Sequence, residues 1–193
     1  DGIAVDTWGV DFGLVARDGS VLANPVHYRD KRNDGMMDEA FKTVPREELY
    51  RETGIQFLPF NTVYQLLSLV KSGSPLLEVA DSLLMMGDLL AYLLSGKKAC
   101  EYTNASTTQL LDPHTRTWNE GLITRLGLPR RLLLDPVAPG TVLGPLREDV
   151  AAAAGLAQGI PVIATASHDT GSAVAAVPVG GDGAPWEIGR AHV

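Results

Sequence analysis

Apolar residues alternate with small residues along residues 3–26, which read IAVDTWGVDFGLVARDGSVLANPV. Alternation with a period of two is typical of strands that bury one face. The pair Asp18-Gly19 lies between two such runs and predicts a two-residue hairpin turn. We therefore expect two or three strands at the start of the chain.

Beyond residue 35 the apolar side chains recur every three or four positions, a spacing that predicts helices. Pro45 suits the first turn of a helix, Asn61 suits a helix cap, and Gly54 and Gly96 suit helix ends. We expect the apolar face of the helix after Asn61 to lie on the core through Val63, Leu66, Leu67 and Val70. The expected helical stretches are MMDEAFKTV, PREELYRETG, NTVYQLLSLV, GDLLAYLLSGKK, NEGLITRLGLP and REDVAAAAGL.

Near the end of the chain, the turn-rich stretch DPVAPGTVLGP is followed by a helix and then by the apolar run IPVIATAS. A continuous apolar run of strand length, after a helix, predicts a strand that is buried on both faces of an α/β sheet. Ligands of α/β folds bind just beyond the carboxyl ends of such strands. Residues 167–170 (SHDT) follow this run, so we expect them to face a ligand.

Composition narrows the class of protein. The chain has 193 residues and is 45% hydrophobic, enough for a core and for one domain or a little more. Its 23 acidic and 16 basic residues lack the basic stripe expected of a protein that binds nucleic acid or an anionic membrane. Cys100 has no second cysteine to pair with, and no secretory signal or long apolar run is present, so we expect a cytoplasmic protein. The start at Asp1, inside an apparent strand, suggests a truncated N-terminus.

The side chains of SHDT admit several kinds of chemistry. A serine hydrolase triad is excluded, because three successive residues point in different directions and cannot converge. A zinc site is not indicated, because the four histidines show no paired ligand spacing. Asp169, flanked by His168 and Thr170, can act as a general base toward an alcohol, or it can cap the helix predicted to follow. Both interpretations stay open.

A second group of candidates lies near the N-terminus. Asp6 and Asp11 would face opposite sides of a regular strand, so only a bend brings them together. Gly9 can supply that bend or let a ligand approach the backbone. The two aspartates are otherwise solvated or bonded to turns. Trp8 is either a core or rim aromatic or a platform for a sugar ring.

Other polar residues give weaker indications of a binding site. Arg29 either belongs to a solvated loop or donates hydrogen bonds to a polyol. A polar cluster either lines a polyol site or serves as ordinary loop and cap chemistry; it comprises Thr103, Asn104, Thr107, Thr108 and Gln109. Neither a P-loop nor a strand-linked G-x-G-x-x-G occurs, which excludes nucleotide sites of those kinds. The residues alone thus indicate an α/β protein with a carboxylate site for a small hydroxylated ligand.

Several segments together resemble the FGGY family of carbohydrate kinases, and within it the branch that acts on L-rhamnulose. These segments are VDTWGVDFGLV, HYRD, GIQFLPFNTVYQL, EYTNASTTQLL, PGTVLG and IPVIATASHDTGSAVAAVP. The resemblance implies two actin-like, ribonuclease-H-like α/β domains with substrates in the cleft between them. Residues 1–186 would form most of the first, sugar-binding domain. The implied reaction transfers the γ-phosphate of ATP, with Mg²⁺, to the 1-hydroxyl of L-rhamnulose.

The resemblance also implies roles for individual residues. Asp169 matches the general base of the family, and His168 and Thr170 flank it at substrate-contacting positions. Gly9 matches a substrate-contacting glycine. Two further residues are matched by neighbourhood alone, Asp11 and Arg29. Phosphoryl transfer requires alignment of the hydroxyl with the γ-phosphate and neutralisation of charge while the base takes the proton.

Two departures from the family pattern stand out. A phosphate-binding hairpin of the form D-x-G-x-x-[ST] should precede Asp1, and a segment with S-G-T-W should follow Trp186; neither is present. The ATP and Mg²⁺ sites are therefore expected mostly outside this chain, which by itself should be inactive. Residues 187–193 (EIGRAHV) resemble no part of the family, and their possible codons match common sequencing-adapter text, which indicates a non-native tail.

Two alternatives to an L-rhamnulose kinase remain. The first is another ketose kinase of the same family, acting on fuculose or xylulose. The second is a non-catalytic, actin-like protein that binds a sugar.

Overall fold

The computed structural model describes residues 1–178 of the 193. The predicted non-native tail at residues 187–193 lies outside the described part. Within the described part, no helix has the length and apolar character that crossing a membrane would require.

Within residues 1–178 the strands form three antiparallel pairs, β1 with β2, β3 with β4, and β5 with β6. The N-terminal segment adds isolated parallel bridges to β6 and to the residues after it, from Ile3 to Val162 and from Thr7 to His168. The strand bounds are β1 (Phe12–Ala16), β2 (Ala80–Met85), β3 (Leu111–Asp112), β4 (Thr117–Trp118), β5 (Thr141–Pro145) and β6 (Pro161–Ala164).

All six predicted helical stretches are helical in the structure. Gly54 and Gly96 end their helices with φ of 66° and 73°, a left-handed conformation that glycine adopts without steric cost. The helices are α1 (Met36–Phe41), α2 (Arg46–Thr53), α3 (Thr62–Lys71), α4 (Leu76–Val79), α5 (Met86–Ser95), α6 (Tyr102–Ser106), α7 (Glu120–Arg125), α8 (Glu148–Ala154) and α9 (Asp169–Ala175), with 3₁₀ turns η1 (Lys31–Asn33) and η2 (Arg130–Leu132).

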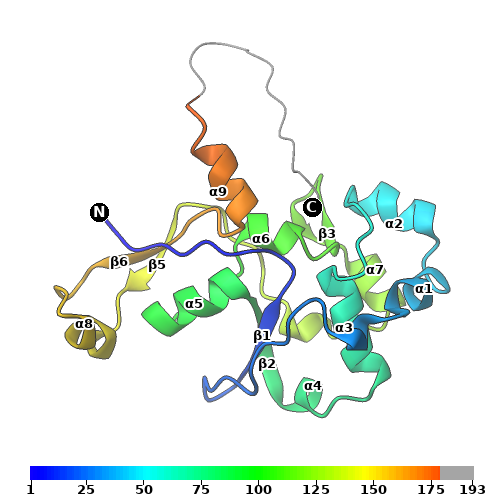
Figure 1. The fold of residues 1–193 in the computed structure, drawn as a ribbon, viewed down its shortest axis with the longest axis horizontal. Helices are drawn as coiled ribbons and strands as arrows, with labels where there is room; N and C mark the ends of the chain where they lie inside the picture. Colours follow the sequence, from blue (N-terminus) through cyan, green and yellow to red (C-terminus); the bar gives the residue numbers. More distant parts are fainter. Residues whose placement is uncertain (179–193) are drawn as a thin grey trace.

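Helix α5 packs against two of the strand pairs. It contacts β1 and β2 as well as β5 and β6, and in Figure 1 it lies between these two pairs. Helices α1, α2, α3 and α7 gather on one side of the molecule, and α8 lies on the other (Figure 1). The result is the mixed α/β arrangement that the sequence predicts.

The main core lies under α3, where Val63 and Leu66 are fully buried and Leu67 nearly so, as predicted from their spacing. Val70, half-buried, packs against the same cluster. Burial of an aliphatic side chain of this size contributes about 1.5–3 kcal/mol. A smaller cluster joins α5, α8 and β6; it comprises Ala91, Leu146, Ala151 and Val162.

Three sequence predictions about strands need correction. The hairpin turn forms, because the Ala16 N–H donates to the Ser20 carbonyl, but the returning chain makes only the Val15–Val21 bridge instead of a strand. The stretch predicted as turns contains β5, because these residues pair with β6. Strand β6 alternates half-buried with buried positions, so it is not buried on both faces.

The prediction that Asn61 caps α3 is confirmed for its position but not for its side chain, which makes no capping hydrogen bond. Asn61 stands at the cap position, but its amide donates to the Gln56 carbonyl and to Gln109 Oε1 instead. Buried amide groups bond to the partners that tertiary packing supplies. The side chain thereby connects the start of α3 to the segment after α6.

Candidate functional site

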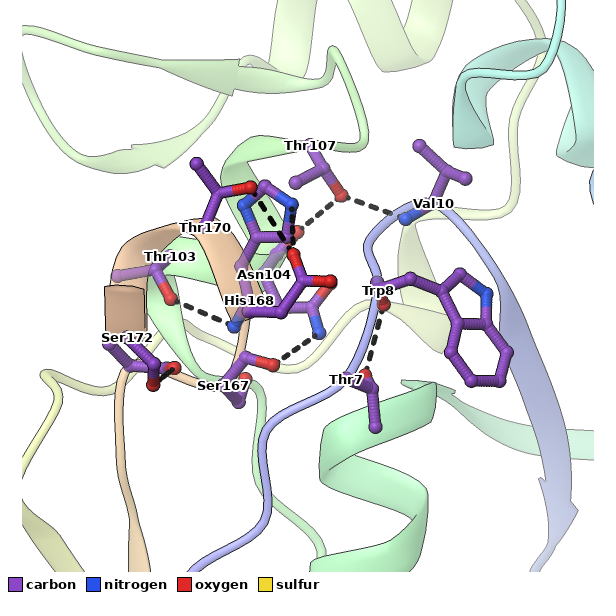
Figure 2. A network of polar contacts seen from close by, with 12 residues as sticks. Thr7, Trp8, Val10, Thr103, Asn104, Thr107, Ser167, His168, Thr170 and Ser172 are labelled. Carbon is purple, nitrogen blue, oxygen red and sulfur yellow. Dashed lines mark hydrogen bonds and ion pairs between the residues drawn. The ribbon is translucent and has the colours of Figure 1, made fainter. Parts of the chain in front are cut away.

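Residues 167–170 follow β6 and run into the first turn of α9, close to where the sequence predicts a ligand-facing segment. The N-cap of α9 is His168, in an extended conformation, and Asp169 is the first helical residue. Figure 2 shows His168 and Thr170 beside Thr103, Asn104 and Thr107, with the N-terminal segment across from them.

Backbone hydrogen bonds tie this segment to the N-terminal segment. The Thr7 N–H donates to the Ser167 carbonyl at 2.9 Å, and the Asp169 N–H donates to the Thr7 carbonyl at 2.7 Å. From α6, Asn104 Nδ2 donates to the Ser167 carbonyl at 3.3 Å, and Thr103 Oγ1 accepts from the His168 N–H at 3.3 Å. Three distant parts of the sequence therefore place Asp169.

The Asp169 side chain is 46% exposed, and its Oδ1 lies 3.5 Å from His168 Nε2. The same oxygen accepts a hydrogen bond from the Thr170 hydroxyl at 3.2 Å. The helix start has no capping hydrogen bond from its cap residue, and Asp169 is not that residue. The capping interpretation therefore loses its geometric basis, whereas an open carboxylate can accept a proton from a bound alcohol.

A sharp bend lies at Gly9 and Val10, where the sequence predicts one. Val10 has φ of 68°, an uncommon conformation for a β-branched residue. Its N–H donates to Thr107 Oγ1 at 3.0 Å, and its carbonyl accepts from Thr62 Oγ1 at 2.7 Å and from Gln65 Nε2 at 3.1 Å. These three bonds hold the strained backbone in place.

Gly9 is buried, and a Cβ at this position would meet the Thr107 side chain at 2.8 Å. Glycine is therefore required by the close approach of Thr107, a residue of the same chain. Contact between the Gly9 backbone and a substrate stays a prediction.

The bend does not bring the two aspartates together. Asp11 is 2% exposed, and it accepts from Trp8 Nε1 at 2.9 Å and from Gln65 Nε2 at 3.2 Å. Asp6 stays exposed, and no hydrogen bond joins it to Asp11. The carboxylate of Asp11 holds the indole of Trp8, which is 44% exposed and so presents an aromatic face to solvent.

Within residues 1–178, Arg29 makes no hydrogen bond or ion pair with these residues. Its N–H donates to His27 Nδ1 at 3.2 Å, and its guanidinium carbon lies 5.5 Å from the centre of the Tyr28 ring. The side chain is exposed. The structure therefore leaves Arg29 outside the network around Asp169, and its contact with a polyol stays a prediction.

The predicted polar cluster divides into two parts. Thr103, Asn104 and Thr107 bond to the segments around Asp169 and Val10, as described above. Thr108 instead donates to the Ala105 carbonyl, and Gln109 Nε2 donates to the Ile55 carbonyl. The second part is buried and structural.

Two buried carboxyl groups were missed by sequence reasoning. Glu101 is fully buried and serves as the cap of α6, with its side chain accepting from the Thr103 and Asn104 N–H groups. Asp88, in the first turn of α5, accepts from the Glu101 N–H at 3.0 Å. Burial raises the pKa of Asp88 to about 8, the backbone bond opposes this shift, and the neighbouring Glu101 adds to it. The position of Glu101 just before residues 102–106, which form α6, could have indicated its capping role.

The sequence of this chain is similar to those of known carbohydrate kinases. Residues 1–176 match the N-terminal domain of the FGGY family of carbohydrate kinases. The chain belongs to this family. A rhamnulokinase from Oceanobacillus iheyensis is 48% identical over 176 residues, which are 91% of this chain and 37% of that protein. A rhamnulokinase from Pectobacterium atrosepticum is 47% identical over 179 residues, which are 93% of this chain and 35% of that protein. This FGGY chain thus spans about a third of the length of these relatives.

Solved structures of sugar kinases share the fold. A xylulose kinase from Lactobacillus acidophilus aligns with a TM-score of 0.76 at 21% identity, covering 84% of this chain and 33% of that one. A carbohydrate kinase from Novosphingobium aromaticivorans aligns with a TM-score of 0.76 at 23% identity, covering 89% and 36%. The actin-like, ribonuclease-H-like fold expected from the sequence is confirmed for the FGGY chain.

Proposed function

We propose that this chain is the sugar-binding part of an ATP-dependent kinase that converts L-rhamnulose to L-rhamnulose 1-phosphate. Relatives named rhamnulokinase, at 45–48% identity along nearly the whole chain, support this proposal. Because the chain spans only about a third of their length, the activity is proposed for a longer protein that contains it.

One observation carries the proposed mechanism: the Asp169 carboxylate is open to solvent at the start of α9, and the backbone N–H of the same residue donates to the Thr7 carbonyl. In the proposed reaction Asp169 accepts the proton of the sugar's primary hydroxyl while that oxygen attacks the phosphoryl group. A general base of this kind is worth about 10² to 10⁴ in rate. His168 and Thr170, beside the carboxylate, are proposed to contact the sugar.

Three further residues complete the proposed sugar site. The backbone of Gly9 and the carboxylate of Asp11 belong to the bend and are proposed to contact the sugar, and Asp11 also accepts a hydrogen bond from Trp8. Arg29 is proposed to reach the sugar from its exposed loop. These three contacts rest on the resemblance to the family more than on the geometry.

ATP and Mg²⁺ are expected for a carbohydrate kinase, with ATP supplying the phosphoryl group. Among residues 1–178, no group of three or more His, Cys, Asp or Glu side chains is placed to hold a metal ion. Mg²⁺ in kinases is usually bound through one or two carboxylates together with substrate phosphates, so a larger group of ligands is not required. The proposal assigns both ATP and Mg²⁺ mostly to the remainder of the longer protein.

The test is a coupled ADP-release assay of the full-length protein with L-rhamnulose, fuculose and xylulose. We expect the highest kcat/KM with L-rhamnulose. A higher kcat/KM with fuculose or xylulose would show that the proposed substrate is wrong. Sugar binding measured by calorimetry, without ADP release, would favour a non-catalytic protein. Residues 1–193 alone should show no ATP-dependent turnover, because phosphoryl transfer depends on alignment of both substrates.

A further inference from the structure

Glu101 lies at the point where α6 meets the segment before Asp169. Its Oε2 accepts from the Ser167 N–H and from the Ser167 hydroxyl, each at 2.9 Å. The same oxygen accepts from the Thr103 hydroxyl at 2.6 Å and from the Asn104 N–H at 3.2 Å. Oε1 accepts from the Thr103 N–H at 2.9 Å. One buried carboxylate thus joins residues that are more than 60 positions apart in the sequence.

Every one of these contacts uses the carboxylate as an acceptor. A buried carboxylate is costly unless donors surround it, and hydrogen bonds to an ionised group are roughly twice as strong as neutral ones. An amide in the same place would aim its NH₂ group at N–H or O–H donors. Glutamine therefore keeps the shape of Glu101 but cannot satisfy the same partners.

The contacts lead directly to Asp169 by two routes. The first runs through Ser167, two residues before Asp169, whose N–H and hydroxyl both donate to Glu101. The second runs through Thr103, whose hydroxyl donates to Glu101 and accepts from the His168 N–H. Both routes reach the backbone that precedes the carboxylate at the start of α9.

We propose that Glu101 is a positioning residue, which sets the direction of the Asp169 carboxylate by holding Ser167 directly and His168 through Thr103. This inference rests on the proposed function, because a kinase needs its base aligned with the sugar hydroxyl. A displacement of about 1 Å in such an arrangement can cost on the order of 100-fold in rate. Glu101 itself touches neither substrate nor the reacting atoms.

The first test does not depend on activity. Amide hydrogen exchange of the full-length protein, followed by mass spectrometry, compares wild type with Glu101→Gln in peptides covering residues 165–175. We expect exchange in these peptides to accelerate at least about tenfold, since the Ser167 and His168 N–H groups lose their arrangement. Unchanged exchange there would overturn the proposal.

Thr53→Val is the matched control, because Thr53 is also buried and donates within its own helix, to the Leu49 carbonyl at 2.8 Å. This variant also loses a buried hydrogen bond, but that bond has no connection to Ser167. It should leave exchange in residues 165–175 and kcat at wild-type values. If Thr53→Val accelerated exchange there as much as Glu101→Gln does, the effect would be general loosening and the proposal would fail.

The second test is a double-mutant cycle in kcat. Glu101→Gln alone should lower kcat by about 10- to 100-fold. In an Asp169→Asn background it should lower kcat by less than about twofold, because there is no longer a base to position. Additive losses would contradict a role through Asp169.

A third variant keeps the test decisive if Glu101→Gln fails to fold. Ser167→Ala removes only the hydroxyl bond to Glu101 and leaves the backbone bond, so we expect about a threefold loss in kcat that disappears in the Asp169→Asn background. A loss that persists there, or no loss, would contradict the proposal. If the wild-type protein phosphorylates no ketose, the proposed function fails, and hydrogen exchange alone decides whether Glu101 holds the segment.

Discussion

Asp11 and Asp169 are both aspartates of the proposed sugar site, but their surroundings differ. Asp11 is 2% exposed, and its two oxygens accept from Trp8 and Gln65. The side chain of Asp169 is 46% exposed and accepts from the neighbouring Thr170 hydroxyl. A carboxylate with its lone pairs occupied by protein donors stabilises structure, whereas one open to solvent can take a proton from a ligand. The comparison predicts that Asp169 affects turnover and Asp11 affects stability.

The largest effect is expected from Asp169→Asn in the full-length protein. An amide keeps the shape but cannot accept the proton, so kcat with L-rhamnulose should fall at least about 100-fold. The free energy of unfolding should change by less than about 0.5 kcal/mol, because the side chain is half exposed. The coupled assay and urea denaturation measure the two quantities. Asp38→Asn, an exposed aspartate in the first turn of α1, is the control, and near-normal turnover of Asp169→Asn would place the base elsewhere.

Asp88 extends the comparison to a carboxyl group in the interior. Its folded-state pKa of about 8 lies above its usual value, so folding favours the protonated form. The stabilisation present below pH 4 should be lost as pH rises toward 8, by at most about 1.4 kcal/mol per pH unit. Asp88→Asn should remove this slope, since an amide does not titrate. Denaturant unfolding of both proteins at pH 5, 6, 7 and 8 tests this, and identical slopes would contradict it.

Asp11→Asn should cost about 1–3 kcal/mol of stability, because an amide offers one acceptor oxygen where the buried carboxylate accepts from two donors, Trp8 and Gln65. The midpoint of urea denaturation measures the change. Asp6→Asn, in the same segment but exposed, is the matched control and should shift stability by less than about 0.5 kcal/mol. Equal costs for the two variants would mean that the hydrogen bonds of Asp11 contribute nothing measurable.

Trp8→Phe should have the smallest effect, below about 1.5 kcal/mol, because it removes one hydrogen bond to Asp11 from a partly exposed ring. In the Asp11→Asn background the cost should shrink, since the bond is already weakened there. Thermal or urea unfolding of the four proteins in this cycle gives the coupling energy. Independent effects would show that the indole is not held by the carboxylate.

Local patterns were sufficient to predict most of the helices, but not the short helices α4 and α6. The spacing of apolar residues in α3 and the glycines that end α2 and α5 act within a few residues of themselves, and each prediction is confirmed. Gly9 was predicted as a point where the strand could bend, and the bend forms, but without joining Asp6 to Asp11 as that prediction supposed. The reason for glycine was not predicted, since Thr107, which approaches it, is about a hundred residues away.

Strand β5, the side chain of Asn61 and the role of Glu101 could not be predicted from neighbours in the sequence. Residues 141–145 have the composition of turns and become a strand only because β6 offers hydrogen-bond partners. Asn61 has the residue type of a cap, but tertiary packing gives its amide two partners elsewhere. In the sequence Glu101 has no feature that marks it as important. Its role depends on Ser167, which donates to it only in the folded chain.

The sequence by itself determined most of the helices, the α/β class, the family resemblance and Asp169 as a candidate base, because these depend on residue type and local periodicity. Tertiary structure decided which carboxylate is buried and which is open, and which donors surround Glu101. The physical reason is that exposure and hydrogen bonding of a side chain depend on groups that approach through space. In this protein those groups come from the N-terminal segment, α6 and the start of α9, which only folding brings together.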